Sequence, residues 1–335
     1  MGFSRAVVPR VIGLAAVSIC VLAAKAAHSQ QRYTRLQSVL GSGWDESGRK
    51  LSLETHIELN LYLIDGDPSE TMVEYTTHPL EKVRTHTHPT IPGGLWLREH
   101  LHGKPSWEVQ TFLAFLTYVP THSYYVDFGT WIGPTLFYAA QLVDKSFGVE
   151  ADPVAFASVS TTLKLNQDKP WGKKATIQPG GVGPGSDEDL TATRVPMKSA
   201  SAGNSCSGMG KKVNCGDVTH EWDVFTYSLP ALIAHWNIDP SNSFIKVDVE
   251  AFECTLVPSW IQWMRKLPTK PTFYISFHSY ITRCSDDEYR GVLQFARMFK
   301  RTMLFSESSL SEIRLENSFE ELEGTAVIFT DRDIM

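Results

Sequence analysis

Strand-like and helix-like segments alternate from Tyr124 to the C-terminus, and this alternation is what most constrains the fold. Pro opens the helix-like segments 134–144 and 153–166, as is typical of a helix start. A chain that alternates in this way predicts an α/β fold, with a mostly parallel sheet and helices on both faces. The strand-like runs are 124–128, 146–150, 175–179, 244–249, 272–278, 302–306 and 325–330.

The remaining segments suggest how the chain is divided. Residues 31–106 are less regular and predict an N-terminal extension that packs on a domain formed by 107–335, with a helix at 106–119. The segment 180–219 is rich in Gly, Ser and Pro without a sustained period, which predicts a long surface insertion. The last strand-like run follows an acidic stretch, SFEELEG, and we expect it to return antiparallel at the sheet edge.

The first thirty residues differ from the rest of the chain. Arg5 and Arg10 precede an apolar run at 11–24, which is followed by small residues. This pattern predicts that 1–30 is a secretory signal peptide or a short signal anchor, with a buried N-terminal helix as the alternative. We therefore expect the protein in the ER or Golgi lumen or secreted, with possible membrane association through this segment.

Cysteine placement and charge narrow the environment and the partners. Cys206 and Cys215 lie nine residues apart in a Gly/Ser/Lys segment, where a disulfide and two free thiols are both open. Cys254 and Cys284 stand in apolar or mixed surroundings and are interpreted as core cysteines. The net charge of -6 comes with scattered basic residues, so no nucleic-acid partner is expected.

VDFGTWIGP, residues 126–134, places a glycine-containing turn between a strand-like run and a helix-like segment. Such a turn allows close approach of a ligand, and the helix that follows adds a positive dipole. Only Gly129 and Gly133 are present, so an ordinary turn with Trp131 in the core is the alternative. Glu150 ends the next strand seventeen residues after Gly133, where an acid can accept hydrogen bonds from two ribose hydroxyls.

Charged residues also end a later strand. In FIKVDVEAFE, residues 244–253, Lys246, Asp248 and Glu250 share one parity along the strand. A structural ion pair between Lys246 and Asp248 is one interpretation. Asp248 and Glu250 nevertheless lie at the carboxyl end, where open α/β sheets bind ligands. His278 in ISFHSY ends the following strand on the same edge.

These blocks, in this order and spacing, resemble the FkbM family of S-adenosylmethionine-dependent methyltransferases. The resemblance covers about 107–330 and rests on VDFGTWIGPTLFYAAQL, FGVEADPVAFASVSTTLKLN and SFIKVDVEAFECTLVPSWIQWM. It implies a class I Rossmann-like methyltransferase fold, S-adenosyl-L-methionine as cofactor, and methyl transfer to oxygen on a small-molecule or glycan acceptor.

The resemblance also assigns residues. Asp248 and Glu250 fall on the Asp-x-Glu of the family, and with His278 they form the expected catalytic set. Our hypothesis is that His278, or failing that Asp248, acts as general base and that Glu250 orients the acceptor. The implied cofactor-binding set is Asp127, Gly129, Thr130, Gly133, Glu150 and Ala151.

The chain departs from the family pattern at Thr130, Trp131, Ala251 and Ser276. These departures motivate an alternative, a methyltransferase-like binding module with impaired turnover. The main interpretation includes no metal ligand. A second enzymatic alternative is a metal site, because His86, His88, His100 and His102 form two His-x-His pairs that strands can bring to one face.

Overall fold

A computed structural model describes residues 72–77, 80–86, 93–199, 208–209, 220–250, 252–278, 284–306, 309–313 and 326–333. The predicted signal segment 1–30, Cys206, Cys215, His88 and Ala251 lie outside the described residues. Within those ranges, no helix combines the length and the apolar character that a membrane span requires.

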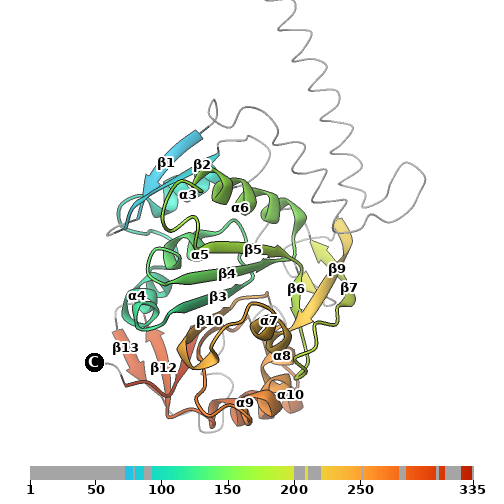
Figure 1. Ribbon diagram of the computed structural model, residues 1–335. Helices are drawn as coiled ribbons and strands as arrows, with labels where there is room; N and C mark the ends of the chain where they lie inside the picture. Colours follow the sequence, from blue (N-terminus) through green and yellow to red (C-terminus); the bar gives the residue numbers. More distant parts are fainter. Residues whose placement is uncertain are drawn as a thin grey trace, which may run out of the picture.

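An eight-stranded sheet forms the centre of the molecule (Figure 1), in the order β13-β12-β14-β11-β10-β3-β4-β5. Five adjacent strands run parallel, because each of their pairings is parallel. They are β3 (Tyr124–Phe128), β4 (Lys145–Glu150), β5 (Ala175–Pro179), β10 (Ser243–Val247) and β11 (Thr272–Ser276). This arrangement is the mostly parallel, Rossmann-like sheet that the alternating sequence predicts.

The remaining strands of the sheet are β12 (Arg301–Ser306), β13 (Ser309–Glu312) and β14 (Ala326–Thr330). β14 is antiparallel to both neighbours, as expected for the last strand, but it lies between β11 and β12. The prediction that it forms the edge is therefore wrong. Val327, Ile328 and Phe329 are all fully buried, which an interior position explains, and the polar strand β13 is the antiparallel edge strand.

Helices cover both faces of the sheet, as side-chain parity along the strands requires. On β3, Val126 and Phe128 join one core and Tyr125 joins the other. The first core packs under α7 (Leu229–His235), α8 (Glu253–Ser259), α9 (Ile261–Met264) and α10 (Asp286–Ala296). The second packs under α3 (Gly94–Leu101), α4 (Val109–Tyr118), α5 (Pro134–Ala139) and α6 (Pro153–Leu165).

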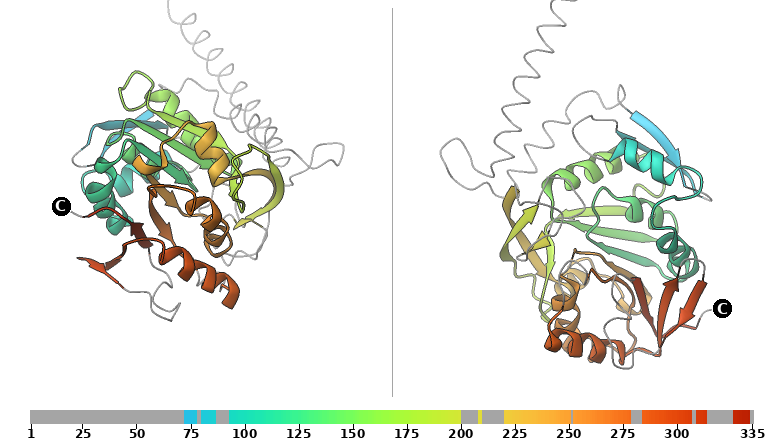
Figure 2. Two further views of the ribbon diagram at one scale, coloured as in Figure 1. Left: turned by 60° about the horizontal axis from the view of Figure 1, so that its bottom comes forward. Right: turned by 180° about the vertical axis from the view of Figure 1, so that it is seen from behind.

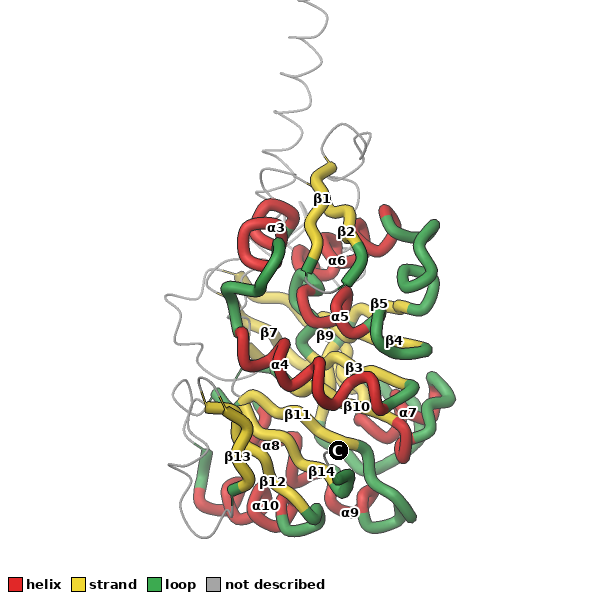
Figure 3. Tube along the Cα trace, turned by 90° about the vertical axis from the view of Figure 1, so that its left-hand side faces the viewer, coloured by secondary structure: helices red, strands yellow, loops and turns green. Residues whose placement is uncertain are grey.

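Helix α4 crosses the central strands (Figure 3), where Phe115 makes edge-on contacts with Tyr125, Phe244 and Tyr274 of three neighbouring strands. Two single 3-10 turns, Val119–Thr121 after α4 and Pro240–Asn242 before β10, complete the connections into the sheet. The helix predicted at 106–119 therefore exists and fixes the N-terminal part of the domain on the sheet.

Within the predicted extension 31–106, the described residues form the helix α3 and a hairpin that packs on α3 and on α6. The hairpin consists of β1 (Met72–Thr76) and β2 (Lys82–His86) in antiparallel pairing. Thr85 and Thr162 share a buried hydroxyl hydrogen bond of 3.0 Å. The side chain of Asn166, after α6, both accepts from the backbone N–H of Arg84 and donates to its carbonyl. The extension is thus joined to the domain by specific polar contacts.

A second, four-stranded sheet lies beside the main one (Figure 2), in the order β6-β9-β7-β8. Its strands are β6 (Gly181–Gly183), β7 (Thr193–Ser199), β8 (Gly208–Met209) and β9 (His220–Ser228). The surface insertion predicted at 180–219 contains β6, β7 and β8, which carry no strand signal in the sequence. In β9, buried Trp222 and Val224 alternate with more exposed Glu221 and Asp223, so this strand has no continuous apolar run.

Cys254 and Cys284 are buried, as predicted for core cysteines, but they are also joined by a disulfide. Cys254 lies in the first turn of α8 and Cys284 just before α10. These two helices also approach closely, because a Cβ at Gly291 would lie 2.6 Å from the ring of Pro258. The bond closes a loop with a sequence separation of 30 residues.

Removing this bond is expected to destabilise the protein. Loop closure on this scale restricts the unfolded chain by about 3–4 kcal/mol, so Cys254→Ala/Cys284→Ala should lose a free energy of unfolding of that order in urea titrations. Reducing agent should destabilise the natural chain more than the double variant, in which only Cys206 and Cys215 could still form a disulfide within the segment 180–219. Peptide mapping after alkylation in denaturant without reductant checks the bond directly, and two alkylated thiols at these positions would contradict it.

Candidate functional site

The candidate site lies at the carboxyl ends of β3 and β10, where the strand order of the sheet reverses direction. From β3 the chain moves outward through β4 and β5, whereas β10 lies on the other side of β3 and is followed by β11. In open α/β sheets, ligands bind outside the carboxyl ends of the strands at this switch point. The predicted cofactor and catalytic residues all belong to this edge or to the loops that leave it.

A buried group of three charges lies directly under the site. Lys246 on β10 is the register partner of Asp127 on β3, and its Nζ lies 3.4 Å from Asp127 Oδ1 and 2.9 Å from Asp248 Oδ2. Thr135 Oγ1 donates to Asp127 Oδ2 at 2.7 Å. Burial acts to lower the pKa of Lys246, but the charges of Asp127, Asp248 and the nearby Glu108 outweigh it, so the pKa of Lys246 is raised and the ammonium stays charged.

Asp127 contributes to the site through this ion pair. Its side chain is fully buried, and its two oxygens are directed at Lys246 and Thr135. The structural ion pair considered for Lys246 and Asp248 is therefore present, and Asp127 makes it a three-membered group. The assignment of Asp127 to the cofactor site stays a prediction, and the contacts of its side chain in this structure are with Lys246 and Thr135.

The loop after β3 folds against the ends of both neighbouring strands. The backbone N–H groups of Gly129 and Thr130 both donate to Val149 O at 3.2 Å, and the Thr130 hydroxyl donates to Asp127 O at 3.0 Å. Gly129 has φ +78, and a Cβ there would lie 1.8 Å from the carbonyl oxygen of Asp248. Glycine is therefore required at this position both by conformation and by space.

Gly133 ends the loop with φ +93, beside the ring of Phe137. Trp131, between the two glycines, also has a positive φ of 51. Its indole packs against Trp96 and Trp107, at ring distances of 4.7 Å and 6.1 Å. The indole of Trp131 is thus directed at α3 and at the segment just before α4.

Glu150 holds the loop to the end of β4. Its Oε2 accepts the backbone N–H of Trp131 at 2.6 Å, and its Oε1 accepts that of Asp152 at 2.7 Å. Burial raises the pKa of Glu150 to about 8, although backbone donors, including the N–H of Ala151, act in the opposite direction. The carbonyl of Ala151 accepts the indole N–H of Trp222, which ties the second sheet to this corner of the site.

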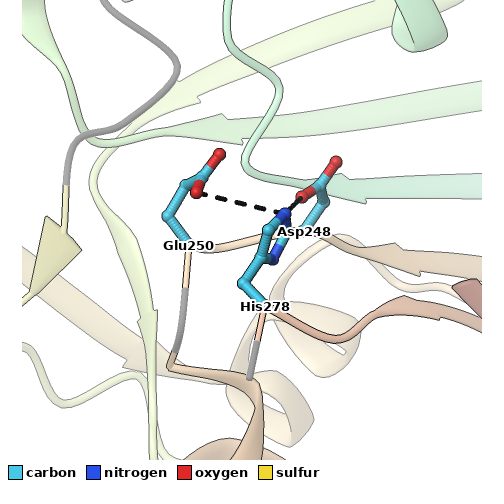
Figure 4. A group of neighbouring side chains, drawn as sticks. All are labelled: Asp248, Glu250 and His278. Atoms are coloured by element: carbon cyan, nitrogen blue, oxygen red, sulfur yellow. Dashed lines mark ion pairs between the residues drawn. The ribbon is translucent and has the colours of Figure 1, made fainter. Parts of the chain in front are cut away.

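The predicted catalytic residues converge on the other side of the loop. Asp248 and Glu250 follow β10 and His278 follows β11, and Figure 4 shows the three side chains directed at one another. His278 Nε2 lies 3.4 Å from Asp248 Oδ1 and 4.0 Å from Glu250 Oε2. Their side chains are 12–18% exposed, so all three are partly accessible to solvent.

His278 is held as an imidazolium by its surroundings. Burial acts to lower its pKa, but the hydrogen bond to Glu253 and the charges of Asp248, Glu253 and Glu250 outweigh it and raise the pKa to about 10. The charge of Asp248 is stabilised in turn, because Lys246 and His278 outweigh its burial and lower its pKa. In this state His278 donates hydrogen bonds, whereas the predicted role of general base requires the neutral ring.

Two further carboxyl groups, those of Glu253 and Glu108, belong to the site and carry no motif in the sequence that marks them as functional. Glu253, in the first turn of α8, accepts from His278 Nδ1 at 3.0 Å and from the backbone N–H of Val249. Glu108 precedes α4 with φ 44 and accepts from Thr111, and burial together with Asp248 raises its pKa to about 7. Glu253 is the first residue of α8, where an acidic side chain is common, so its position could have been found from the sequence. The sequence around Glu108 contains no pattern that places it near Asp248.

The alternative metal site at the His-x-His pairs finds no support among the described residues. His86 is buried and hydrogen-bonded to Ser158, His100 stacks on Trp96, and His102 accepts from the backbone of Thr76. Across the described ranges, the residues that gather at metal-ligand spacing are Asp248, Glu250 and His278. Ser276, one of the departures from the family pattern, lies half-buried at the end of β11.

Comparison with known proteins gives similarity to methyltransferase structures. The chain is similar to methyltransferase FkbM from Methylobacillus flagellatus KT, with 16% identity and a TM-score of 0.36, over 63% of this chain and 44% of that one. It is also similar to the O-methyltransferase from Bacillus cereus in complex with SAH, with 12% identity and a TM-score of 0.35, over 70% and 84% of the two chains. The chain thus spans less than half of the FkbM structure. No family model and no curated protein matches the sequence.

Lys246→Met is expected to lower the free energy of unfolding by about 3–5 kcal/mol, because it leaves two buried carboxylates without their cation. Lys270→Met is the matched control, since Lys270 pairs with Asp331 at 2.7 Å in a partly exposed position. That change should cost about 1 kcal/mol or less. Urea unfolding of the two variants measures the difference, and equal losses would show that the buried group has no special role.

Proposed function

We propose that the protein is an S-adenosylmethionine-dependent methyltransferase that transfers a methyl group to a hydroxyl oxygen. The observation that carries the proposal is the meeting of two residue sets at the switch point. The loop 129–133 and Glu150 form one set, and Asp248, Glu250 and His278 form the other. Gly129 lies against the backbone of Asp248, so a ligand on the loop lies beside the cluster.

The residues at the first set fit an adenosylated methyl donor. Gly129 and Gly133 allow the loop to take positive φ values and to pass close to Asp248 and Phe137, and Glu150 places a carboxyl group at the end of β4, the position suited to ribose hydroxyls. The oxygens of Glu150 already accept the backbone N–H groups of Trp131 and Asp152, which holds the carboxyl group in place, and a carboxylate oxygen can accept more than one hydrogen bond. The cofactor, when bound, supplies a methyl group on a positively charged sulfur.

The second set fits a hydroxylated acceptor. An acceptor hydroxyl has to be aligned with the donor and has to lose its proton during transfer, and alignment accounts for much of the rate in such reactions. Asp248, the alternative base, accepts the hydrogen bond and then the proton of the hydroxyl while Glu250 orients the acceptor, and the charged ring of His278 holds both carboxylates in place. A role for His278 as the base requires that the ring first lose its own proton.

We further propose FkbM-like O-methylation of a carbohydrate-like acceptor within the secretory pathway. The residue blocks quoted from the sequence support the family resemblance, and the N-terminal pattern supports entry into that pathway. The Cys254–Cys284 disulfide adds support, because such bonds persist in oxidising compartments. Incubation with methyl-labelled S-adenosylmethionine and a panel of glycans, polyols and lipids tests the acceptor class. Label found on nitrogen or carbon would overturn transfer to oxygen.

Calorimetry with S-adenosylmethionine should find one site per chain, and Gly129→Ala should weaken it at least tenfold. A methyl group at this position collides with Asp248 O and forces the loop away from the cluster. Gly103→Ala is the matched control, because Gly103 has nearly the same φ, +75, and nothing within 4 Å of its Cβ position. It should cost about 1–2 kcal/mol of backbone strain and leave cofactor affinity unchanged.

The two glycine variants also define what contradicts the proposal. Thermal unfolding first establishes that both are folded. If the natural chain binds no S-adenosylmethionine at millimolar concentration, the enzyme assignment is wrong. If Gly129→Ala and Gly103→Ala bind equally well, the cofactor does not lie on this loop.

Cofactor affinity should rise with pH through the ionisation of Glu150. Its pKa of about 8 means that the carboxyl is largely protonated at neutral pH and becomes a full acceptor for ribose hydroxyls only above that value. The Kd for S-adenosylhomocysteine should therefore fall by at most about tenfold per unit up to about pH 8 and level off above it. Glu150→Gln should remove this slope, and parallel profiles for the two proteins would contradict the role of Glu150.

A further inference from the structure

The geometry points to a binding site for a divalent first-row metal ion of the Mn²⁺ type, with Asp248, Glu250 and His278 as its ligands. These three residues are expected from the sequence to act as catalytic groups, and the only metal alternative there concerns the His-x-His pairs. The site itself rests on the described side chains, and only its catalytic use rests on the proposed methyltransferase function.

The spacing of the three ligand atoms matches a metal site. One atom from each side chain lies within 4.8 Å of the other two, with 3.4 Å between His278 Nε2 and Asp248 Oδ1 and 4.0 Å between His278 Nε2 and Glu250 Oε2. Ligands about 2.1 Å from one ion lie about 3 Å apart at a right angle and about 4 Å apart on opposite sides. Shifts of a fraction of an ångström bring these atoms to such distances.

The imidazole is already oriented as a metal ligand. His278 Nδ1 donates to Glu253 Oε1 at 3.0 Å, which directs Nε2 at Asp248 and Glu250. Glu253 is itself fixed, because it is 1% exposed and the same oxygen accepts the backbone N–H of Val249 at 3.0 Å. Histidines that bind metals commonly donate their second nitrogen to a carboxylate in this way, and the bond sets both the ring orientation and the tautomer.

The two carboxylates are held by the strand ends. Asp248 Oδ2 pairs with Lys246 at 2.9 Å, and Asp248 Oδ1 faces His278. The buried ion pair therefore uses one oxygen and leaves the other directed at the proposed metal position. Glu250, at φ 51, follows directly in the loop after β10. The three ligands thus directly follow two adjacent strands of the central sheet, which limits their freedom to move, as a preorganised site requires.

The donor set selects the kind of ion. Two carboxylate oxygens and one imidazole nitrogen suit Mn²⁺, Fe²⁺ or Zn²⁺ better than Mg²⁺ or Ca²⁺, which prefer oxygen ligands alone. Three protein ligands leave coordination positions open, as in catalytic rather than structural sites. Binding of the ion through Nε2 would release the proton of that nitrogen, and the ion would lower the pKa of an acceptor hydroxyl, so that a weaker base suffices to remove the hydroxyl proton.

Mn²⁺ binding to the full chain tests the inference. After chelator treatment and dialysis, titration with MnCl₂ followed by the EPR signal of free Mn²⁺ should give one site per chain. His278→Ala and Glu250→Gln should each weaken binding at least tenfold, and Glu253→Gln, through ring orientation, by about 10–100-fold. His102→Ala is the control, because His102 lies on the surface away from the cluster, and it should bind as the natural chain does.

Competition and folding controls make each outcome decisive. Zn²⁺ should displace Mn²⁺ at lower concentration than Mg²⁺ or Ca²⁺, and circular dichroism establishes that each variant is folded. Absence of stoichiometric Mn²⁺ and Zn²⁺ binding, equal binding by folded Glu250→Gln, or equal displacement by Ca²⁺ would overturn the site. Calorimetry with S-adenosylmethionine separates the two proposals, because cofactor binding without Mn²⁺ binding refutes only the metal site, and the reverse refutes only the methyltransferase.

Discussion

The candidate site depends on one buried cation, Lys246, placed between Asp127 and Asp248 at the centre of the parallel sheet. The ammonium has almost no contact with water, and a charge in that position is tolerable only with close partners. The register of β3 and β10 supplies Asp127 at 3.4 Å, and the end of β10 supplies Asp248 at 2.9 Å. The ion pair therefore fixes the orientation of Asp248, from which the rest of the cluster is built.

Close backbone contacts connect the two halves of the site. Gly129 lies against the carbonyl of Asp248, and the N–H of Trp131 in the same loop is bound by Glu150. A movement of the loop is therefore transmitted both to the strand-end acid and to the cluster around His278. Helix α4 is joined to the sheet by a hydrogen bond of 2.6 Å between the hydroxyl groups of Thr111 and Tyr274. Glu108, which precedes this helix, interacts electrostatically with Asp248.

Much of this arrangement could be predicted from the sequence, because buried parallel strands have a strong local signal. The runs 124–128 and 175–179 coincide with β3 and β5, and the acids at strand ends reach one edge because parallel strands share their direction. The order of strands in a sheet has no such local signal, so the sequence does not reveal that β14 lies between β11 and β12. Apolar and polar side chains alternate in β9, so the second sheet has no long apolar run that would indicate it. Glu108 reaches the site only because α4 packs on the sheet, which is a tertiary contact.

A crystal structure of the complex with S-adenosylhomocysteine would test the proposed site most directly. We predict that the ribose hydroxyls bind Glu150, that the ligand lies along the loop from Gly129 to Gly133, and that its sulfur faces Asp248, Glu250 and His278. A complex in which the ribose is bound by another residue, or in which the sulfur faces away from this cluster, would contradict the assignment of the carboxyl edge as a methyl-transfer site.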